Sequence, residues 1–130
     1  MGELAQKNGA SDSAKSFGQM LEQDHSAANQ KAIGAAQAIG VTAPTAPSAK
    51  QKSEYDRMAK LTGARFDSEF AKMMVADHKK DISEYQRASK KNDEVGAYAK
   101  ESLPVLEKHL QTAQSLEREA ANTGKRSLLW

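Results

Sequence analysis

The sequence predicts an all-α protein in which long helices form one antiparallel bundle. Aromatic residues make up only 5 % of the chain, so a core has to come mostly from Ala, Leu, Met, Val and Ile. Ala and Met favour helices, whereas the β-branched and aromatic enrichment typical of strands is missing. Apolar residues also recur at three- and four-residue steps, which is the period of one helix face. At 130 residues the chain is expected to form a single domain.

Charge and composition argue against several classes of protein. The 19 Lys and Arg residues are interspersed with 17 Asp and Glu residues, so no basic stripe is present and we expect no nucleic-acid partner. The absence of cysteine excludes disulfides, thiolate metal sites and cysteine nucleophiles. No run of about 18 apolar residues occurs, so no transmembrane segment is expected. The opening residues, MGELAQKNGA, lack the apolar stretch of a signal peptide.

The first part of the chain predicts a short helical end followed by a long helix. Residues 2–9 look like the end of a helix. Ser11 is a suitable N-cap for a long helix over residues 11–39, and Gly40 suits the position just after its end. Its apolar positions share one face. They are Phe17, Leu21, Ala28, Ala32, Ala35 and Ile39.

A proline-rich loop and a short helix come next. Residues 41–47 contain two of the three prolines, and proline restricts both its own backbone and that of the residue before it. Ser48 and Gln51 have the spacing of a capping box, so a short helix is expected over residues 48–62, closed by Gly63. The inner face of this helix is expected to carry Tyr55, Met58 and Leu61.

Two more long helices complete the predicted bundle. One is expected over residues 64–90 and the other over residues 93–121, with the Asn-Asp pair between them as N-cap. Pro104 lies inside the last helix and should kink it, because proline has no N–H to donate to the preceding turn. Residues 122–130 are expected to form a frayed tail.

An internal repeat relates two of the long helices. The segment FGQMLEQDH (17–25) matches FAKMMVADH (70–78) with a constant offset of 53 residues. The two segments share their Phe, the first Met, and an Asp-His pair at the end. Two related helical hairpins would explain the match.

All three histidines fall on predicted inner faces, one on each long helix. Each follows an apolar inner residue by three or four positions. A buried polar group needs a partner, and three imidazoles on adjacent helices are able to share one. We therefore consider a site for one Zn, Cu or Fe ion at His25, His78 and His109.

Three acidic residues are candidates to support this site. Asp24 and Asp77 each precede a histidine, about 100° around the helix, where a carboxylate can orient an imidazole of a neighbouring helix. Glu22 and His25 have the Glu-x-x-His spacing of di-iron sites in helical bundles. The repeat places Val75 where a second such Glu would stand, so a di-iron centre is not expected.

Other interpretations of the same residues remain open. In the alternative hypothesis, each histidine is a core residue held by an Asp or a backbone carbonyl, and Asp–His pairs brace the bundle without a metal. Thioethers are also ligands of Cu(I), although methionine at helical spacing more often fills a core. The residues concerned are Met20, Met58, Met73 and Met74.

Catalytic motifs are missing from the chain. It has no Gly-rich phosphate loop, and no serine stands in a nucleophile motif. We therefore assign no catalytic residue and no site for an organic cofactor. The sequence does not favour an enzyme.

Three segments of the chain resemble a known bacterial family. They are FGQMLEQDHSAAN (17–29), FDSEFAKMMVADH (66–78) and LPVLEKHLQTAQSL (103–116), which look like the ferritin-like domain of unknown function four-one-four-two. The resemblance covers residues 3–117. It implies a ferritin-like four-helix bundle, exported to the periplasm or cell envelope, and it implies no activity. The family's recurrent polar residues map to His25, His78, His109, Asp24 and Asp77, together with Pro104.

The resemblance also implies a longer first helix than the short one at residues 2–9. An incomplete first wall would leave an apolar groove that favours a homodimer. Two hypotheses follow for the function. In a cell-envelope metal-binding bundle, the three imidazoles converge on one point. In a non-enzymatic structural or protein-interaction module, the histidines lie at separate depths, each with its own protein partner.

Overall fold

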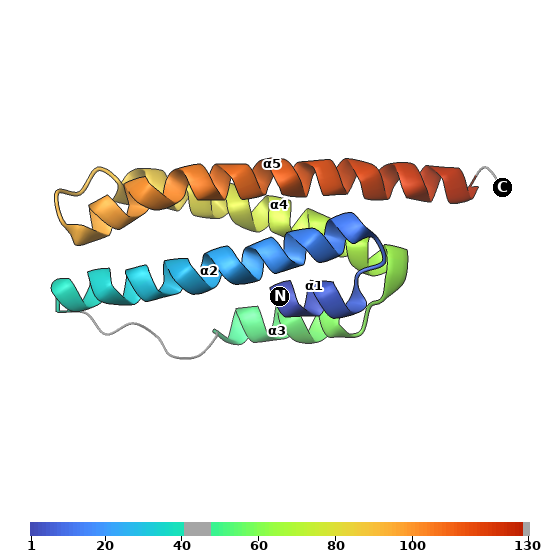
Figure 1. Ribbon diagram of the computed structural model, residues 1–130, viewed down its shortest axis with the longest axis horizontal. Helices are drawn as coiled ribbons and strands as arrows, with labels where there is room; N and C mark the ends of the chain where they lie inside the picture. The colour runs from blue at the N-terminus through green and yellow to red at the C-terminus, as the bar shows by residue number, and fades with distance from the viewer. Residues whose placement is uncertain (41–47, 129–130) are drawn as a thin grey trace.

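The chain folds into a bundle of helices in a computed structural model that describes residues 1–40 and 48–128 (Figure 1). Within those ranges there is no strand, and a single isolated bridge pairs Gly9 with Gly63. The all-α prediction is confirmed. The helices are α1 (Gly2–Asn8), α2 (Asp12–Ala38), α3 (Ala49–Ala59), α4 (Gly63–Ala88) and α5 (Glu94–Leu128).

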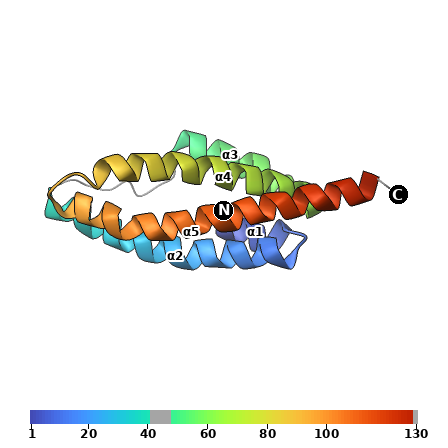
Figure 2. The ribbon, with the colours of Figure 1, turned by 90° about the horizontal axis from the view of Figure 1, so that it is seen from above.

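The long helices do not simply alternate in direction. The α2 and α4 helices run the same way along the bundle, and α5 runs antiparallel to both (Figures 1 and 2). The α3 helix runs opposite to α2 and α4, so it carries the chain back and α4 starts at the same end of the bundle as α2. The α5 helix packs against α4 and α2, and α1 packs against α2 and α4.

Local side chains set the predicted helix ends. The Ser11 hydroxyl accepts a hydrogen bond from the backbone N–H of the first turn of α2, and Gly40 follows that helix with φ +78°. Ser48 and Gln51 form the predicted capping box at the start of α3. At the start of α5, Asp93 Oδ1 accepts a hydrogen bond from a backbone N–H at 2.9 Å.

Two helix ends differ from the sequence prediction. The short helix ends at Ala59, and Gly63 does not close it but begins α4 with φ +65°. The last helix passes through Pro104 and continues to Leu128, so the expected frayed tail at 122–130 is largely helical. Its Ala, Glu, Lys and Arg residues favour helix, and one glycine costs only about 1 kcal/mol. The expected loop at 41–47 lies outside the described residues.

The core lies where α1, α2, α4 and α5 meet. The rings of Phe17 and Phe70 are 5.8 Å apart between centroids, and Phe66 stacks on Phe70 at 5.4 Å. Burying each such side chain contributes roughly 1.5–3 kcal/mol. Two residues of the predicted inner faces are instead exposed, Ile39 at 43 % and Tyr55 at 45 %. Other large buried side chains are Leu4, Leu21, Met58, Met74, Leu106 and Leu116.

A buried carboxylate joins the α1–α2 turn to helix α4 at one end of the bundle. Asp67 on α4 accepts hydrogen bonds from the backbone N–H groups of Ala10 and Ser11, both at 2.9 Å. Nearby, the Asn8 side chain donates to the carbonyl of Leu61 at 3.0 Å. These bonds hold the α1–α2 turn against the start of α4, and none of them was predicted from the sequence.

Candidate metal centre

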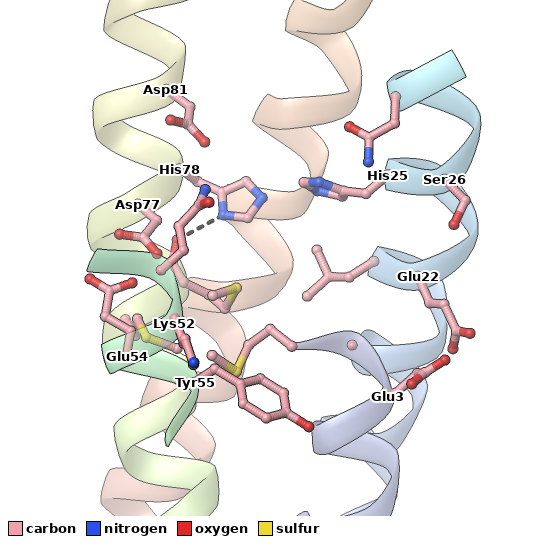
Figure 3. A pocket seen from close by; sticks show the side chains of 17 residues that line it. Glu3, Glu22, His25, Ser26, Lys52, Glu54, Tyr55, Asp77, His78 and Asp81 are labelled. Atoms are coloured by element: carbon pink, nitrogen blue, oxygen red, sulfur yellow. Dashed lines mark hydrogen bonds between the residues drawn. The ribbon is translucent and has the colours of Figure 1, made fainter. Parts of the chain in front are cut away.

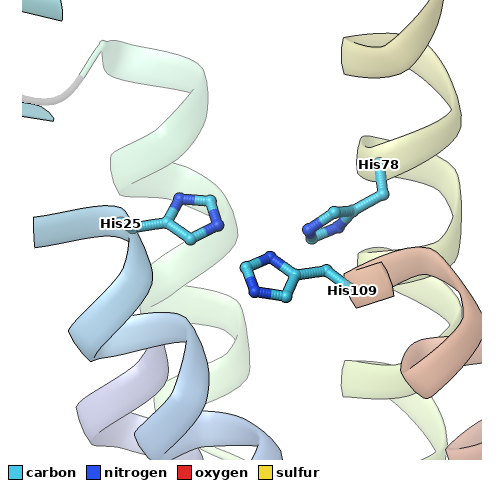
Figure 4. Close-up of side chains that lie close together, drawn as sticks. All are labelled: His25, His78 and His109. Atoms are coloured by element: carbon cyan, nitrogen blue, oxygen red, sulfur yellow. The ribbon is translucent and has the colours of Figure 1, made fainter. Parts of the chain in front are cut away.

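The three histidines converge from three helices at one level of the bundle (Figure 4). His25 comes from α2, His78 from α4 and His109 from α5. One ring nitrogen of each lies within 4.8 Å of the corresponding nitrogens of the other two. The ring centroids are 5.4 to 6.0 Å apart. The arrangement is therefore a single cluster, and the histidines do not lie at separate depths.

The internal repeat explains why two of these rings stand level. Phe17 faces Phe70 across the bundle, and His25 faces His78 at a centroid distance of 6.0 Å. Both pairs have the same sequence offset. Such matched pairs are possible only between helices that run in the same direction, as α2 and α4 do.

His78 has one ring nitrogen bonded and the other free. Its Nδ1 donates a hydrogen bond to the carbonyl of Met74, one turn earlier in α4, at 2.8 Å (Figure 3). Because Nδ1 carries the proton, Nε2 has a lone pair available. This Nε2 atom is buried, and among the described residues it has no hydrogen-bond partner.

His109 shows the same arrangement with the two nitrogens exchanged. The residue is completely buried, and its Nε2 donates to Asp24 Oδ2 at 2.7 Å. Its Nδ1 atom is buried and has no hydrogen-bond partner in the described part of the chain. The ring of Phe17 packs edge-on against it at 6.2 Å and holds its orientation.

These two bonds match the way proteins hold histidines that ligate metals. A ligating imidazole usually donates its other N–H to a carboxylate or a backbone carbonyl, which sets the tautomer and the direction of the free lone pair. His109 uses a carboxylate and His78 uses a carbonyl. A buried polar atom left unsatisfied costs about 1–3 kcal/mol, and two such nitrogens lie here in one cluster.

The surroundings of His25 and His78 favour the neutral form of each imidazole. The pKa of His25 is lowered to about 4, mainly by loss of water around the ring and then by the neighbouring His109 and His78. Burial also lowers the pKa of His78, although its bond to Met74 opposes this change. Neutral imidazole is the form that binds a metal ion, so the lone pairs of these two residues are available at neutral pH.

The cluster is somewhat wider than a loaded metal site. Metal–nitrogen bonds of 2.0–2.1 Å place the nitrogens of a tetrahedral site about 3.3 Å apart. The present separations of up to 4.8 Å need ring movements of about 1 Å to reach that spacing. His25 is the exposed member of the three, so it has the most freedom to make this adjustment.

An open groove of about 940 Å³ leads to the cluster (Figure 3). It is lined by residues of α1, α2, α3 and α4, and both His25 and His78 form part of its wall. Carboxylates outnumber cationic side chains in this lining, so the groove attracts cations. The charged side chains are Glu3, Glu22, Lys52, Glu54, Asp77 and Asp81.

The predicted supporting residues have different surroundings. Asp24 orients a ring on a neighbouring helix, as expected. Glu22 instead accepts a hydrogen bond from Gln6 at 2.7 Å and points away from His25 (Figure 3). Asp77 lines the groove but makes no hydrogen bond or ion pair with a histidine within the described ranges. The methionines considered as copper ligands are part of the core or pack against it. The buried core includes Met58, Met73 and Met74, and the partly buried Met20 packs against this core.

One acidic residue near the cluster was missed in the sequence analysis. Asp81 lies on the groove wall, three residues after His78 on α4. Its His-x-x-Asp spacing places both side chains on one helix face, and this spacing was the available signal. The predicted supporting carboxylates were only those adjacent to a histidine or in Glu-x-x-His spacing.

Comparison with known proteins identifies a family. A family model described as a domain of unknown function (DUF4142) matches residues 1–116 of the chain. Searches of curated proteins and of solved structures gave no match. Within the described residues, no helix combines the length and the apolar character needed to cross a membrane.

Proposed function

The chain belongs to the DUF4142 family, a domain of unknown function, and from its geometry we propose that it binds one divalent transition-metal ion. His25, His78 and His109 are the ligands of this proposal. The observation that carries it is the pair of buried, unpaired nitrogens, Nε2 of His78 and Nδ1 of His109. A metal ion would satisfy both lone pairs at once.

The ligand type narrows the choice of ion. Three neutral imidazoles suit Zn²⁺, Cu²⁺ and Fe²⁺, whereas Mg²⁺ and Ca²⁺ prefer oxygen ligands. The acidic groove supports the proposal because it raises the local concentration of cations beside His25. The proposed function is therefore the holding of a transition-metal ion inside a helical bundle.

The alternative proposal, a bundle braced by Asp–His pairs, has one observation in its favour. The bond between Asp24 and His109 links α2 to α5 as such a brace would. The repeat predicts an equivalent role for Asp77, but His78 bonds the Met74 carbonyl instead. A brace also leaves the second nitrogen of each buried ring without a partner.

Metal binding to the untagged protein, stripped with a chelator, tests the proposal directly. We expect about one Co²⁺ or Zn²⁺ per chain by calorimetry and mass spectrometry. His25→Ala is the sharpest variant, because this histidine is exposed and its loss leaves the core intact. Its affinity should fall by more than the roughly 10–100-fold that follows loss of a residue that merely orients a ligand.

A matched control separates ligand loss from a change of groove charge. Glu54→Gln removes a charge from the groove wall without touching a histidine, and it should bind metal within a few-fold of wild type. Bound metal should also raise thermal stability, by about 2.7 kcal/mol at a free concentration 100 times Kd. Absence of binding by every ion tested would reject the metal site and favour the structural module.

The cell-envelope location and the homodimer expected from the resemblance are separate proposals. The groove beside the short α1 helix is compatible with a second copy covering it. Sedimentation of the untagged protein across a concentration series tests the dimer, and cell fractionation tests the location.

A further inference from the structure

We infer that Asp81 is the fourth protein ligand of the ion, which would then be held by three imidazoles and one carboxylate. This inference rests on the proposed function, because it concerns the same ion. It assigns the site a definite composition, and the charge of Asp81, together with that of the Asp24 carboxylate bonded to His109, balances the charge of a divalent ion.

The placement of Asp81 carries the inference. It follows His78 by three residues on α4, so the two side chains share one helix face. Both line the groove, and Asp81 lies beside His78 on the side of α4 that faces it (Figure 3). In helical bundles a Glu followed three residues later by a His is a known ligand pair, and here the same spacing occurs with His78 first and an Asp as the carboxylate.

The carboxylate of Asp81 is also free to bind. The residue is half-buried, and among the described residues it makes no hydrogen bond and no ion pair. Two other carboxylates near the cluster, those of Asp24 and Glu22, are already engaged. Asp24 accepts from His109 at 2.7 Å, and Glu22 accepts from Gln6 at the same distance.

Asp77 is the natural rival, since it lies in the same groove. It precedes His78 by one residue, which turns its side chain about 100° away around the helix.

Charge balance gives a second reason for a carboxylate ligand. A divalent ion among three neutral imidazoles would keep two positive charges in a mostly buried site, and buried charge is costly without compensation. The Asp24 carboxylate, which is hydrogen-bonded to His109, supplies one negative charge next to the ion. The Asp81 carboxylate would supply the second as a ligand. Four protein ligands also close the coordination sphere, as in sites that hold a metal without catalysis.

Asp81→Asn and Asp77→Asn form a matched pair for the test. Both keep the size of the side chain, remove one charge and lie on the same helix in the same groove. The probe is Co²⁺ alone, whose visible absorption bands report coordination. Asp81→Asn should shift these bands and weaken binding by about tenfold or more. Asp77→Asn should keep the wild-type bands and bind within about threefold of wild type.

Each outcome separates the two proposals. If the wild-type protein binds no Co²⁺, the proposed function fails and this inference fails with it. If wild type binds Co²⁺ but both variants keep its spectrum, the role of Asp81 is overturned and the three-histidine site stands, even when both bind more weakly through lost charge. Circular dichroism of the metal-free variants checks that each still folds.

Discussion

Asp24 on α2 and His109 on α5 are joined by a hydrogen bond of 2.7 Å between Oδ2 and Nε2, next to the free nitrogens of the histidine cluster. The bond fixes the tautomer of a completely buried ring. It thereby decides that Nδ1 of His109, rather than Nε2, faces His25 and His78. Asp24 is not a member of the histidine cluster, but its hydrogen bond to His109 sets the orientation of one of the three rings.

Asp24→Asn should weaken metal binding more than folding. An amide can still accept from His109, but it lacks the charge that strengthens the bond and makes the imidazole a better ligand. We expect a loss of roughly 10–100-fold in Zn²⁺ affinity, measured by competition with a chromophoric chelator. The control is Glu101→Gln, which breaks the exposed ion pair with Lys31 between the same two helices. Equal affinities for both variants would contradict this role of Asp24.

The metal-free protein should lose stability as the pH falls from about 6.5 toward 4. The pKa of His25 is 6.5 in an unstructured chain and about 4 in the fold, so in this range the unfolded chain binds more protons. His25 therefore destabilises the fold on acidification, and its effect is absent above pH 6.5. His78 acts in the same direction because its pKa is also lowered.

Urea unfolding across this pH range, with a chelator present, measures the effect. The neighbours of His25 include Asp24 and the chain's amino terminus, and the groove carboxylates Asp77 and Asp81 have raised pKa values that act in the opposite direction. Comparing wild type with His25→Ala isolates the histidine. If His25 contributes as expected, the free energy of unfolding of His25→Ala changes less with pH than that of wild type. Parallel pH profiles for the two proteins would refute this contribution.

Asp67→Ala should destabilise the end of the bundle where two turns meet. It leaves the partly buried N–H groups of Ala10 and Ser11 without their acceptor, and we expect a total loss of about 1–3 kcal/mol. Asp67→Asn keeps one oxygen and should cost less. The free energy of unfolding in urea gives the total, and hydrogen exchange at Ala10 and Ser11 shows where protection is lost. Full protection of these amides in Asp67→Ala would argue against the contact.

Phe70→Ala should be among the most damaging substitutions in the core. The ring is fully buried and contacts both Phe17 and Phe66, so its removal leaves a cavity that costs about 3–5 kcal/mol. Ile33→Ala is the control, because this side chain is 43 % exposed, and it should stay within about 0.5 kcal/mol of wild type. Equal losses in the two variants, measured by urea unfolding, would show that the core lies elsewhere.

The helix ends show where sequence reasoning works. Ser11, Ser48 and Gly40 were predicted correctly because each acts on the backbone within its own turn. The predicted end of α5 at residue 121 was wrong, because the helix continues to Leu128. Neither a capping side chain nor a proline marks the end of this helix, so the prediction depended on weak helix propensities. The ferritin-like assignment stays a prediction, since no solved structure matched.

Asp67 could not be identified as a structural residue in the sequence. It looks like one more charged residue in a mixed-charge helix. Its partners lie 56 and 57 residues away, and only the packing of α1 and α2 against α4 brings their N–H groups to it. Asp81 was missed for a related reason, because its proposed role depends on where the groove opens.

By itself the sequence determined that the chain is helical and that each long helix carries one histidine in line with its apolar face, because helical period and caps are local properties. Only the tertiary structure decided that these histidines meet. The parallel course of α2 and α4 keeps the repeat in register, so that Phe17 faces Phe70 and His25 faces His78. With those phenylalanines level and the helices antiparallel, the two histidines would lie about 24 Å apart at 1.5 Å per residue. The direction of a helix in the bundle is set by the path of the chain between helices, which no local pattern records.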